Sequence, residues 1–136
     1  MIQMNNPLKN ARAQLIADQI NAGGAAGKIK IYSANRPAAG AAITDQVLLA
    51  TLACAYPCEA DISAGVLTFD TIADSQAAAN GTAAWCRIED STGAWVLDGD
   101  VKAQTEPQAA LISLVNGREL YQGGFVEVGT ARLVEA

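Results

Sequence analysis

The fold class is decided by one stretch, residues 83–101, which reads AAWCRIEDSTGAWVLDGDV. Two runs rich in aromatic and aliphatic residues flank Asp90-Ser91-Thr92-Gly93, whose residue types favour a turn. The pattern predicts a β-hairpin that forms the rigid centre of the domain. Because side chains alternate along a strand, the residues expected to contribute most of the burial are Cys86, Ile88, Val96 and either Trp85 or Trp95.

Further strands are expected on both sides of this hairpin, because short apolar or alternating runs recur there between turn residues. Those before the hairpin are residues 28–33, 47–53 and 66–69, and those after it are residues 111–115, 125–128 and 131–134. Short strands without helical patterns between them argue against a parallel sheet, which needs crossover helices. The sequence therefore predicts an all-β fold, an antiparallel β-sandwich of jelly-roll type with one N-terminal α-helix.

The single helix is expected before the first strand. Asn6 is a candidate N-cap, Pro7 suits the first turn, and Asn21-Ala22-Gly23-Gly24 ends the helix. Large apolar residues recur at helical spacing on a stripe wider than a small alanine-rich sandwich is expected to cover. We therefore expect an interface there, with candidate residues Leu8, Leu15, Ile16 and Ile20. The chain divides into an N-terminal helical arm, residues 1–27, and a β-sandwich domain, residues 28–136.

Composition narrows the classes of function. The chain has 136 residues, of which 17% are charged against a usual share of about 25%, and its formal net charge is −5. Because no stripe of basic residues is present, no nucleic-acid partner is expected. Histidine is absent, which removes the most common general base and metal ligand. We therefore expect a protein that is not an enzyme and that holds no cofactor and no metal ion.

The chain also lacks the sequence features of a membrane protein. No apolar run approaches the ~18 residues of a membrane span, and residues 1–6 do not have the pattern of a targeting signal. No membrane partner is expected, and we expect the chain to stay in the compartment where it is made.

The three cysteines do not form a metal-binding or redox motif. Cys54 and Cys58 are separated by Ala55-Tyr56-Pro57, and neither a second cysteine pair nor a histidine completes a zinc site. Alternation places Cys86 on the core face of its strand. We expect free thiols that act as small hydrophobic residues, in a reducing compartment.

Acidic residues gather at both ends of the predicted hairpin, namely Glu89, Asp90, Asp98 and Asp100. Carboxylates in such positions could meet as a catalytic pair or hold a calcium ion. Asp90 and Asp98 precede turn-forming residues, however, so hydrogen bonds to nearby backbone N–H groups explain them more simply.

Two further groups of residues have both a binding and a structural interpretation. Trp85 and Trp95 could stack on a sugar, although a cross-strand pair that covers a sheet face is the more common arrangement. Gly23, Gly24 and Gly27 loosely resemble a phosphate-binding loop, yet they follow a helix instead of preceding one. This order favours a helix stop.

Two pairs of segments carry a resemblance to a known family. The first is Gly24-Ala25-Ala26-Gly27-Lys28-Ile29-Lys30-Ile31-Tyr32 with Arg36-Pro37-Ala38, and the second is residues 85–93 with residues 96–101. In this order, behind an N-terminal helix, they resemble small virion proteins of tailed bacteriophages, over residues 7–134. Within that family the chain is most similar to the jelly-roll cementing, or decoration, proteins of the phage head.

The resemblance implies a structural protein of the virion, on the outer surface of the capsid, assembled in the host cytoplasm and without catalysis. It would bind the major capsid protein and join neighbouring subunits as a homodimer. The alternative that the resemblance allows is a receptor- or carbohydrate-binding module at a tail tip or fibre. That alternative would place Trp85, Trp95 or Tyr121 on an exposed face with acidic neighbours.

Overall fold

The computed structural model describes residues 2–107 and 110–134 of the chain. One helix, α1 (Asn6–Ile20), precedes the strands. The longer strands are β1 (Lys28–Tyr32), β2 (Leu48–Ala53), β3 (Glu59–Ser63), β4 (Val66–Phe69), β7 (Trp85–Glu89), β8 (Trp95–Ala103), β9 (Ile112–Leu114) and β12 (Val128–Val134). The strands of two residues are β5 (Ser75–Gln76), β6 (Gly81–Thr82), β10 (Glu119–Leu120) and β11 (Phe125–Val126).

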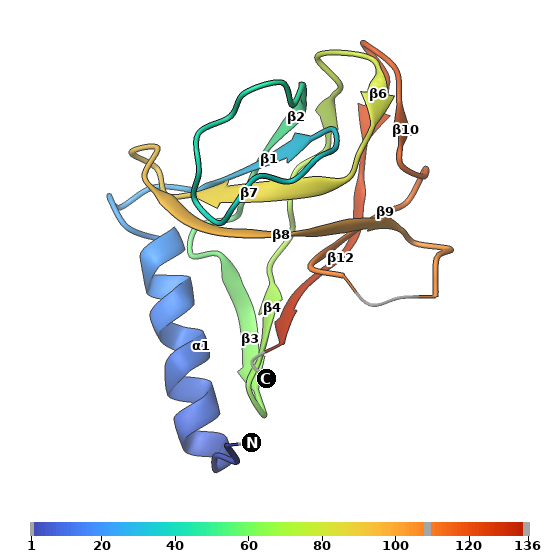
Figure 1. Cartoon of the computed structure of the whole chain (residues 1–136). Helices are drawn as coiled ribbons and strands as arrows, with labels where there is room; N and C mark the ends of the chain where they lie inside the picture. The colour runs from blue at the N-terminus through green and yellow to red at the C-terminus, as the bar shows by residue number, and fades with distance from the viewer. Residues whose placement is uncertain (1, 108–109, 135–136) are drawn as a thin grey trace.

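The longer strands form one curled, 8-stranded sheet in the order β2-β1-β7-β8-β9-β12-β4-β3. Figure 1 shows β1, β7 and β8 crossing the molecule, while β3, β4 and β12 run at a steep angle to them. The two halves of the sheet therefore face each other across the core, as the layers of a sandwich do. The predicted all-β fold of sandwich or jelly-roll type, with one N-terminal helix, is confirmed.

The predicted hairpin is present, and one other pairing departs from the expected arrangement. β7 and β8 are antiparallel neighbours, with Cys86 opposite Gly99. β8 and β9, in contrast, run parallel, with Val101 opposite Ile112. The prediction of a wholly antiparallel sheet is wrong at this pair, because the chain after β8 returns to the same end of the sheet before it enters β9.

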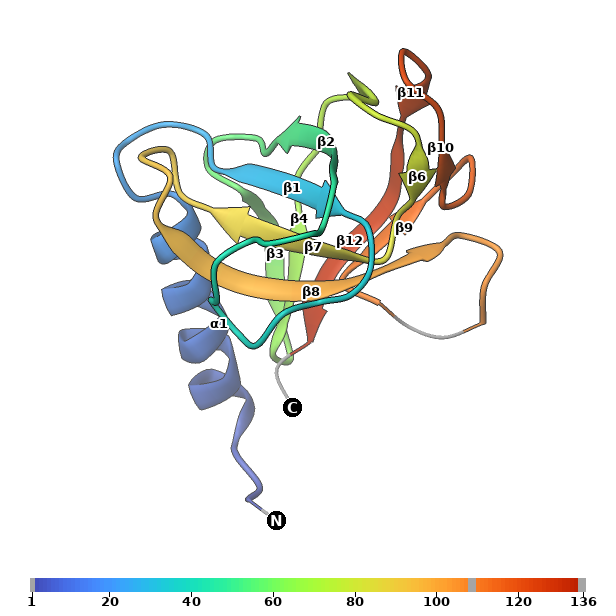
Figure 2. The ribbon, with the colours of Figure 1, turned by 45° about the horizontal axis from the view of Figure 1, so that its top comes forward.

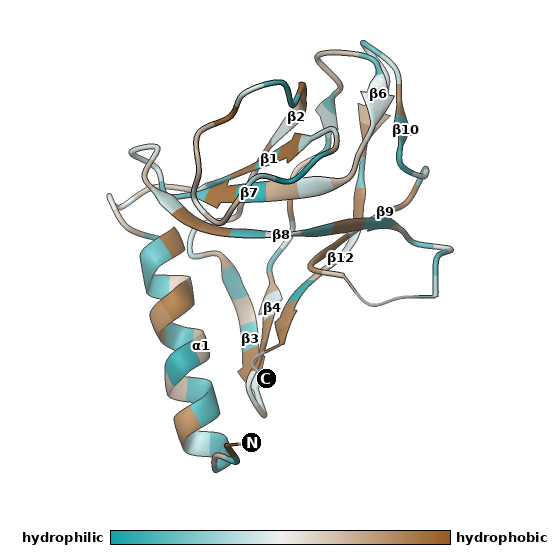
Figure 3. Cartoon of the chain, in the orientation of Figure 1, coloured by the Kyte–Doolittle hydropathy of each residue, from teal (hydrophilic) through white to brown (hydrophobic). Residues whose placement is uncertain are grey.

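The hydrophobic core lies inside the curl of the sheet. Ile29 and Ile31 on β1 lie opposite Ile88 and Cys86 on β7, and all four side chains are fully buried. Apolar stretches of the other strands, brown in Figure 3, complete this core with Leu49, Leu52, Leu67, Ile112 and Leu114. The predicted burial of Cys86 and Ile88 is confirmed, and Val96 packs against the core while partly exposed.

The start of α1 differs by one residue from the prediction. The side chain of Asn5, not of Asn6, accepts a hydrogen bond of 2.9 Å from the N–H of Leu8 and caps the helix. Asn6 falls within the first turn beside Pro7. Two adjacent asparagines both suit an N-cap, and proline is tolerated throughout the first turn, so the sequence could not choose between them.

The buried face of α1 consists of two alanines and one isoleucine. Ala13, Ala17 and Ile20 have no exposed surface and belong to the same core as the sheet. Because an alanine side chain is only a methyl group, the helix approaches β3 and β4 closely on this face. Residues 1–27 were predicted to be an N-terminal helical arm, and within them α1 packs into the same core as the sheet. The helix is also too short and too polar to cross a membrane, and no other described helix could do so.

Candidate functional site

The structure separates the predicted interface residues of α1 into two groups. Leu8 and Leu15 keep 47% and 65% of their surface exposed, and Ile16 is partly buried. Ile20 is fully buried in the chain's own core, so it is not available to another molecule and the prediction is wrong for this residue. The error arises because Ile20 lies on the same face of the helix as Ala13 and Ala17, and this face packs into the core.

An apolar groove of about 350 Å³ runs between α1 and the start of β8. Its helical wall consists of Leu15, Ile16 and Gln19, and its other wall consists of Trp95, Val96 and Leu97. In Figures 1 and 2, the end of α1 that carries Ile20 lies beside this part of β8. The exposed Leu15 and the half-exposed Trp95 therefore stand on opposite walls of one groove.

Trp95 is held in position by residues that are distant in sequence. Its indole Nε1 donates a hydrogen bond of 3.0 Å to Asp98 Oδ1. The ring packs on Gly40, where a Cβ atom would lie only 3.0 Å from the indole and where φ is +71°. Glycine suits this position because both the positive φ and the close ring exclude a side chain. The indole is thus an ordered surface group.

Asp98 forms the most buried ion pair among the described residues. Its two carboxylate oxygens accept hydrogen bonds from Nε and Nη2 of Arg87, at 2.8 and 3.1 Å. Both side chains are almost completely buried. Burial acts to raise the pKa of Asp98, but the hydrogen bonds from Arg87, Gly40 and Trp95 outweigh it and hold the pKa below its ordinary value.

A second small core lies on the outer face of the sheet, under the loop of residues 33–47. The rings of Tyr32 and Trp85 stack at 4.8 Å, and Arg87 lies 5.3 Å from the Trp85 ring centroid. Trp85 Nε1 donates to the carbonyl of Ser33 in the loop. Trp85 therefore pairs with a neighbour on β1, and the predicted cross-strand pair with Trp95 is wrong.

The same loop is tied to β8 by charged groups. Arg36 donates to the Asp98 carbonyl and to the Asp100 carboxylate, each at 3.0 Å, and Gly40 donates its N–H to Asp98. Figure 2 shows the loop passing in front of β7 and β8. Because its contacts combine buried aromatic surface with hydrogen bonds, the loop fixes the outer face of the hairpin.

Each acidic residue of the hairpin has its own partner. Asp90 accepts from the N–H groups of Thr92 and Ala94 in the turn, as predicted. Glu89 pairs with Lys30 at 3.0 Å and Asp100 pairs with Arg36. Asp98 was predicted to be a turn residue, but it lies within β8 and pairs with Arg87. In residues 2–107 and 110–134, no three acidic or cysteine side chains are grouped so that they could hold a metal ion.

All three cysteines are free and buried. Burial raises the pKa of Cys54 to about 11 and that of Cys86 to about 12. The pKa of Cys58 is also raised, by burial and by the neighbouring carboxylate of Glu59. Thiols with such pKa values are protonated near neutral pH, which makes them poor nucleophiles. Their predicted role as small buried hydrophobic residues is confirmed.

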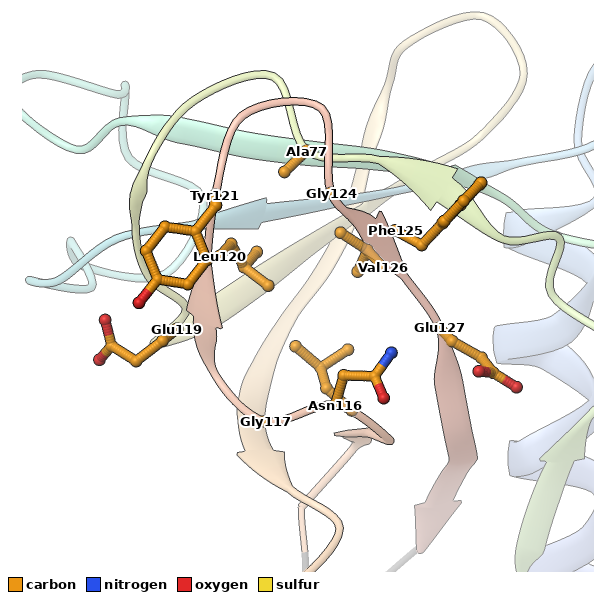
Figure 4. A pocket seen from close by; sticks show the side chains of 11 residues that line it. Ala77, Asn116, Gly117, Glu119, Leu120, Tyr121, Gly124, Phe125, Val126 and Glu127 are labelled. Carbon is orange, nitrogen blue, oxygen red and sulfur yellow. The ribbon is translucent and has the colours of Figure 1, made fainter.

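A second hollow, which the sequence did not indicate, lies between β10 and β11. Figure 4 shows Leu120 and Val126 projecting toward each other across it, with Asn116 at its lower edge. The residues around it are a Gly-rich turn and strands of only two residues. Their short length gave no periodicity from which a site could be predicted.

No protein-family model, curated protein or solved structure matches this chain.

Proposed function

We propose that this chain is a structural protein of a tailed bacteriophage that binds the outside of the head. In this role it cements neighbouring major capsid protein subunits, as a homodimer and without a catalytic step. The family resemblance of residues 24–38 and 85–101 motivates the proposal. The observation that carries it is the apolar groove between α1 and β8, with Leu15 and Trp95 exposed on its two walls.

The groove supports this proposal because contacts within the chain hold a side chain of each wall in place. Trp95 is held by Asp98 and Gly40, and Ile16 is partly buried against the hydrophobic core. Little conformational entropy is lost when such a surface binds, and exposed tryptophan and leucine side chains supply apolar area. Weak contacts of this kind gain strength when many copies bind a repeating shell.

The proposal is tested with purified heads that lack this protein. Wild-type chain should sediment with the heads at a copy number close to that of the capsid protein. Leu15→Ser should bind more weakly, because the substitution removes exposed apolar surface from the groove without opening the core. Sedimentation with quantified protein bands gives both the copy number and the affinity.

A matched control is available on β12. Val134 is 68% exposed, which is close to the 65% of Leu15, and it lies outside the groove. Val134→Ser should bind heads as the wild type does. Wild-type chain that fails to bind heads, or binds at a few copies per particle, would refute the cementing function.

A carbohydrate- or receptor-binding module at the tail is the second candidate. Of the aromatic residues considered for it, Trp85 is buried, and the indole N–H of Trp95 is bonded to Asp98. Tyr121 favours this candidate, since it is 68% exposed and lines the hollow beside Glu119. Binding of the isolated chain to a glycan array, lost in Tyr121→Ala, would support it.

A further inference from the structure

The hollow between β10 and β11 has an apolar floor. Leu114, Leu120 and Val126 are buried to 94% or more, since their exposed fractions are 1%, 6% and 2%. Its volume is about 200 Å³, below the ~300 Å³ at which pockets for drug-sized ligands begin. The hollow is therefore suited to a single long side chain and not to a large organic ligand.

The rim of the hollow is aromatic and acidic. Tyr121 and Phe125 each keep 68% of their surface exposed. Figure 4 shows the carboxylates of Glu119 and Glu127 on opposite sides of the hollow. Among the described residues, no lysine or arginine lines the hollow. The apolar space therefore has an acidic residue on each side.

A neighbouring hollow of about 360 Å³ is also lined by acidic residues. It shares Glu127 and is lined by Asp70 and Asp74, again without a lysine or arginine. Two neighbouring hollows are thus lined by four acidic residues, namely Glu119, Glu127, Asp70 and Asp74. Four of the chain's fourteen acidic residues therefore line these two hollows.

The basic group closest in sequence does not offset this charge. Arg118 precedes Glu119, but its Nε donates to Glu106 at 2.7 Å and its Nη1 donates to the carbonyl of Ala83. Arg118 lines neither hollow. Its charge is balanced by Glu106, and the negative field at the hollow remains.

We propose that the hollow between β10 and β11 binds a lysine or arginine side chain on the surface of a partner protein. Such a side chain has an apolar stem and a cationic head, which match the floor and the rim. A sugar fits less well, because its hydroxyl groups would face Leu114, Leu120 and Val126 without hydrogen-bond partners. The partner that we name is a basic patch of the capsid shell, and only this choice of partner rests on the proposed function.

The binding step can be measured without any phage particle. The probe is Nα-acetylarginine amide, titrated into the ¹⁵N-labelled chain and followed by NMR. Saturable shifts are expected at the amides of residues 119–127. Glu119→Gln/Glu127→Gln should weaken binding by about fivefold for each charge removed, as a surface charge pair of about 1 kcal/mol implies.

Two controls make the result specific. Asp45→Asn/Asp61→Asn removes the same charge from exposed carboxylates outside both hollows and should leave the shifts at residues 119–127 unchanged. Nα-acetylnorleucine amide, which has the stem without the charge, should bind more weakly than the arginine probe. Shifts spread over the surface, equal binding of the two probes, or stronger binding of a methyl glycoside would each overturn the proposal.

The same variants separate this inference from the proposed function. If wild-type chain does not bind heads, the cementing function fails, while the NMR titration still decides whether the hollow takes a basic side chain. If wild-type chain binds heads and Glu119→Gln/Glu127→Gln binds them equally well, the hollow does not contact the shell. The cementing function would then stand, and the capsid shell would be ruled out as the partner of this hollow.

Discussion

Trp85 and Trp95 lie on neighbouring strands but differ in their surroundings. Trp85 is 1% exposed and stacks on Tyr32, whereas Trp95 is 47% exposed on the wall of a groove. Trp85→Ala should therefore lower the free energy of unfolding by about 3–5 kcal/mol, because a large cavity would remain under the 33–47 loop. Trp95→Ala should cost clearly less. Thermal melting curves of the two variants give the comparison.

These melting curves also test the interpretation of the outer face. If the two substitutions lowered the melting temperature equally, the distinction between a core tryptophan and a surface tryptophan would be wrong. A Trp95→Ala variant that melts near the wild-type temperature but binds heads weakly would place Trp95 in the interface. Its surface role would then be separate from stability.

The buried Arg87–Asp98 ion pair should contribute more to the free energy of unfolding than the exposed Arg36–Asp100 pair next to it. Asp98→Ala leaves the buried guanidinium of Arg87 without its partner, and such a loss typically costs about 3–5 kcal/mol. Asp100→Ala breaks a pair whose side chains are 42% and 61% exposed, and should cost at most about 1 kcal/mol. Urea unfolding curves measure both. Equal losses would contradict the role given to burial.

Asp98 also contributes to the pH dependence of stability. Its pKa in the folded chain lies below its ordinary value of about 3.9, so the unfolded chain binds the proton more tightly. The stabilisation is complete above about pH 4 and is lost as the pH falls through the folded value. Asp90 and Glu106, whose pKa values are also lowered, act in the same direction.

The corresponding measurement is the free energy of unfolding between neutral and acidic pH. The wild type should lose stability steadily below about pH 4, and Asp98→Ala should lose less over the same range. Parallel curves for the two proteins would show that the Asp98 carboxyl does not titrate differently in the folded and unfolded chain.

At the scale of the secondary-structure elements, α1 depends on its alanines. Ala17 is fully buried between the helix and the sheet, while Ala11 lies on the exposed side of the same helix. Ala17→Leu should destabilise the fold by about 1–3 kcal/mol, because a longer side chain forces the helix away from β3 and β4. Ala11→Leu adds the same atoms in solvent and should be nearly neutral. Chemical denaturation of both variants tests the closeness of the packing.

The elements that the sequence predicted well are those with a local signal. Residues 83–101 contain two apolar runs and an Asp-Ser-Thr-Gly turn, and they form β7, β8 and their connection. β3 was not predicted, since Glu59–Ser63 mixes charged and small residues, and only pairing with β4 makes it a strand. The parallel pair β8 and β9 could not be predicted either, because strand order depends on tertiary contacts.

The candidate site was predicted only in part. Leu8 and Leu15 were predicted to be interface residues and are exposed, whereas Ile20, predicted with them, is buried. All are large and apolar, and only the packing of Ala13 and Ala17 decides which side of the helix faces the core. The second wall of the groove, Trp95 to Leu97, comes from a strand distant in sequence, so no local pattern indicated it.

At the scale of the whole molecule, the helix and the sheet form one unit. Ala13, Ala17 and Ile20 share a core with β-strand residues, and Asn21 binds Glu59 and the Cys58 N–H across the junction. Removal of residues 1–22 would therefore expose the core and unfold the sheet. An interface on α1 is better tested with single surface substitutions such as Leu15→Ser.

The reactivity of the three thiols can show whether the helix and the sheet unfold as one cooperative unit. Cys54 and Cys58 lie in the connection from β2 to β3, and Cys86 lies in β7. Each is at most 5% exposed. Because burial raises their pKa values, none should react with a thiol reagent at about pH 8 while the chain is folded. In denaturing guanidinium chloride all three should react at once.

Under mildly destabilising conditions the three thiols should react at one common rate, since a single core must open to expose any of them. Mass spectrometry of partly labelled chain would show only unlabelled and fully labelled molecules. Ala11→Cys, on the exposed side of α1, is the positive control and should react promptly in the folded chain. Early labelling of Cys54 and Cys58 alone would instead mean that the β2 to β3 connection and the end of α1 open separately from the hairpin. The curled sheet would then consist of two units that unfold independently.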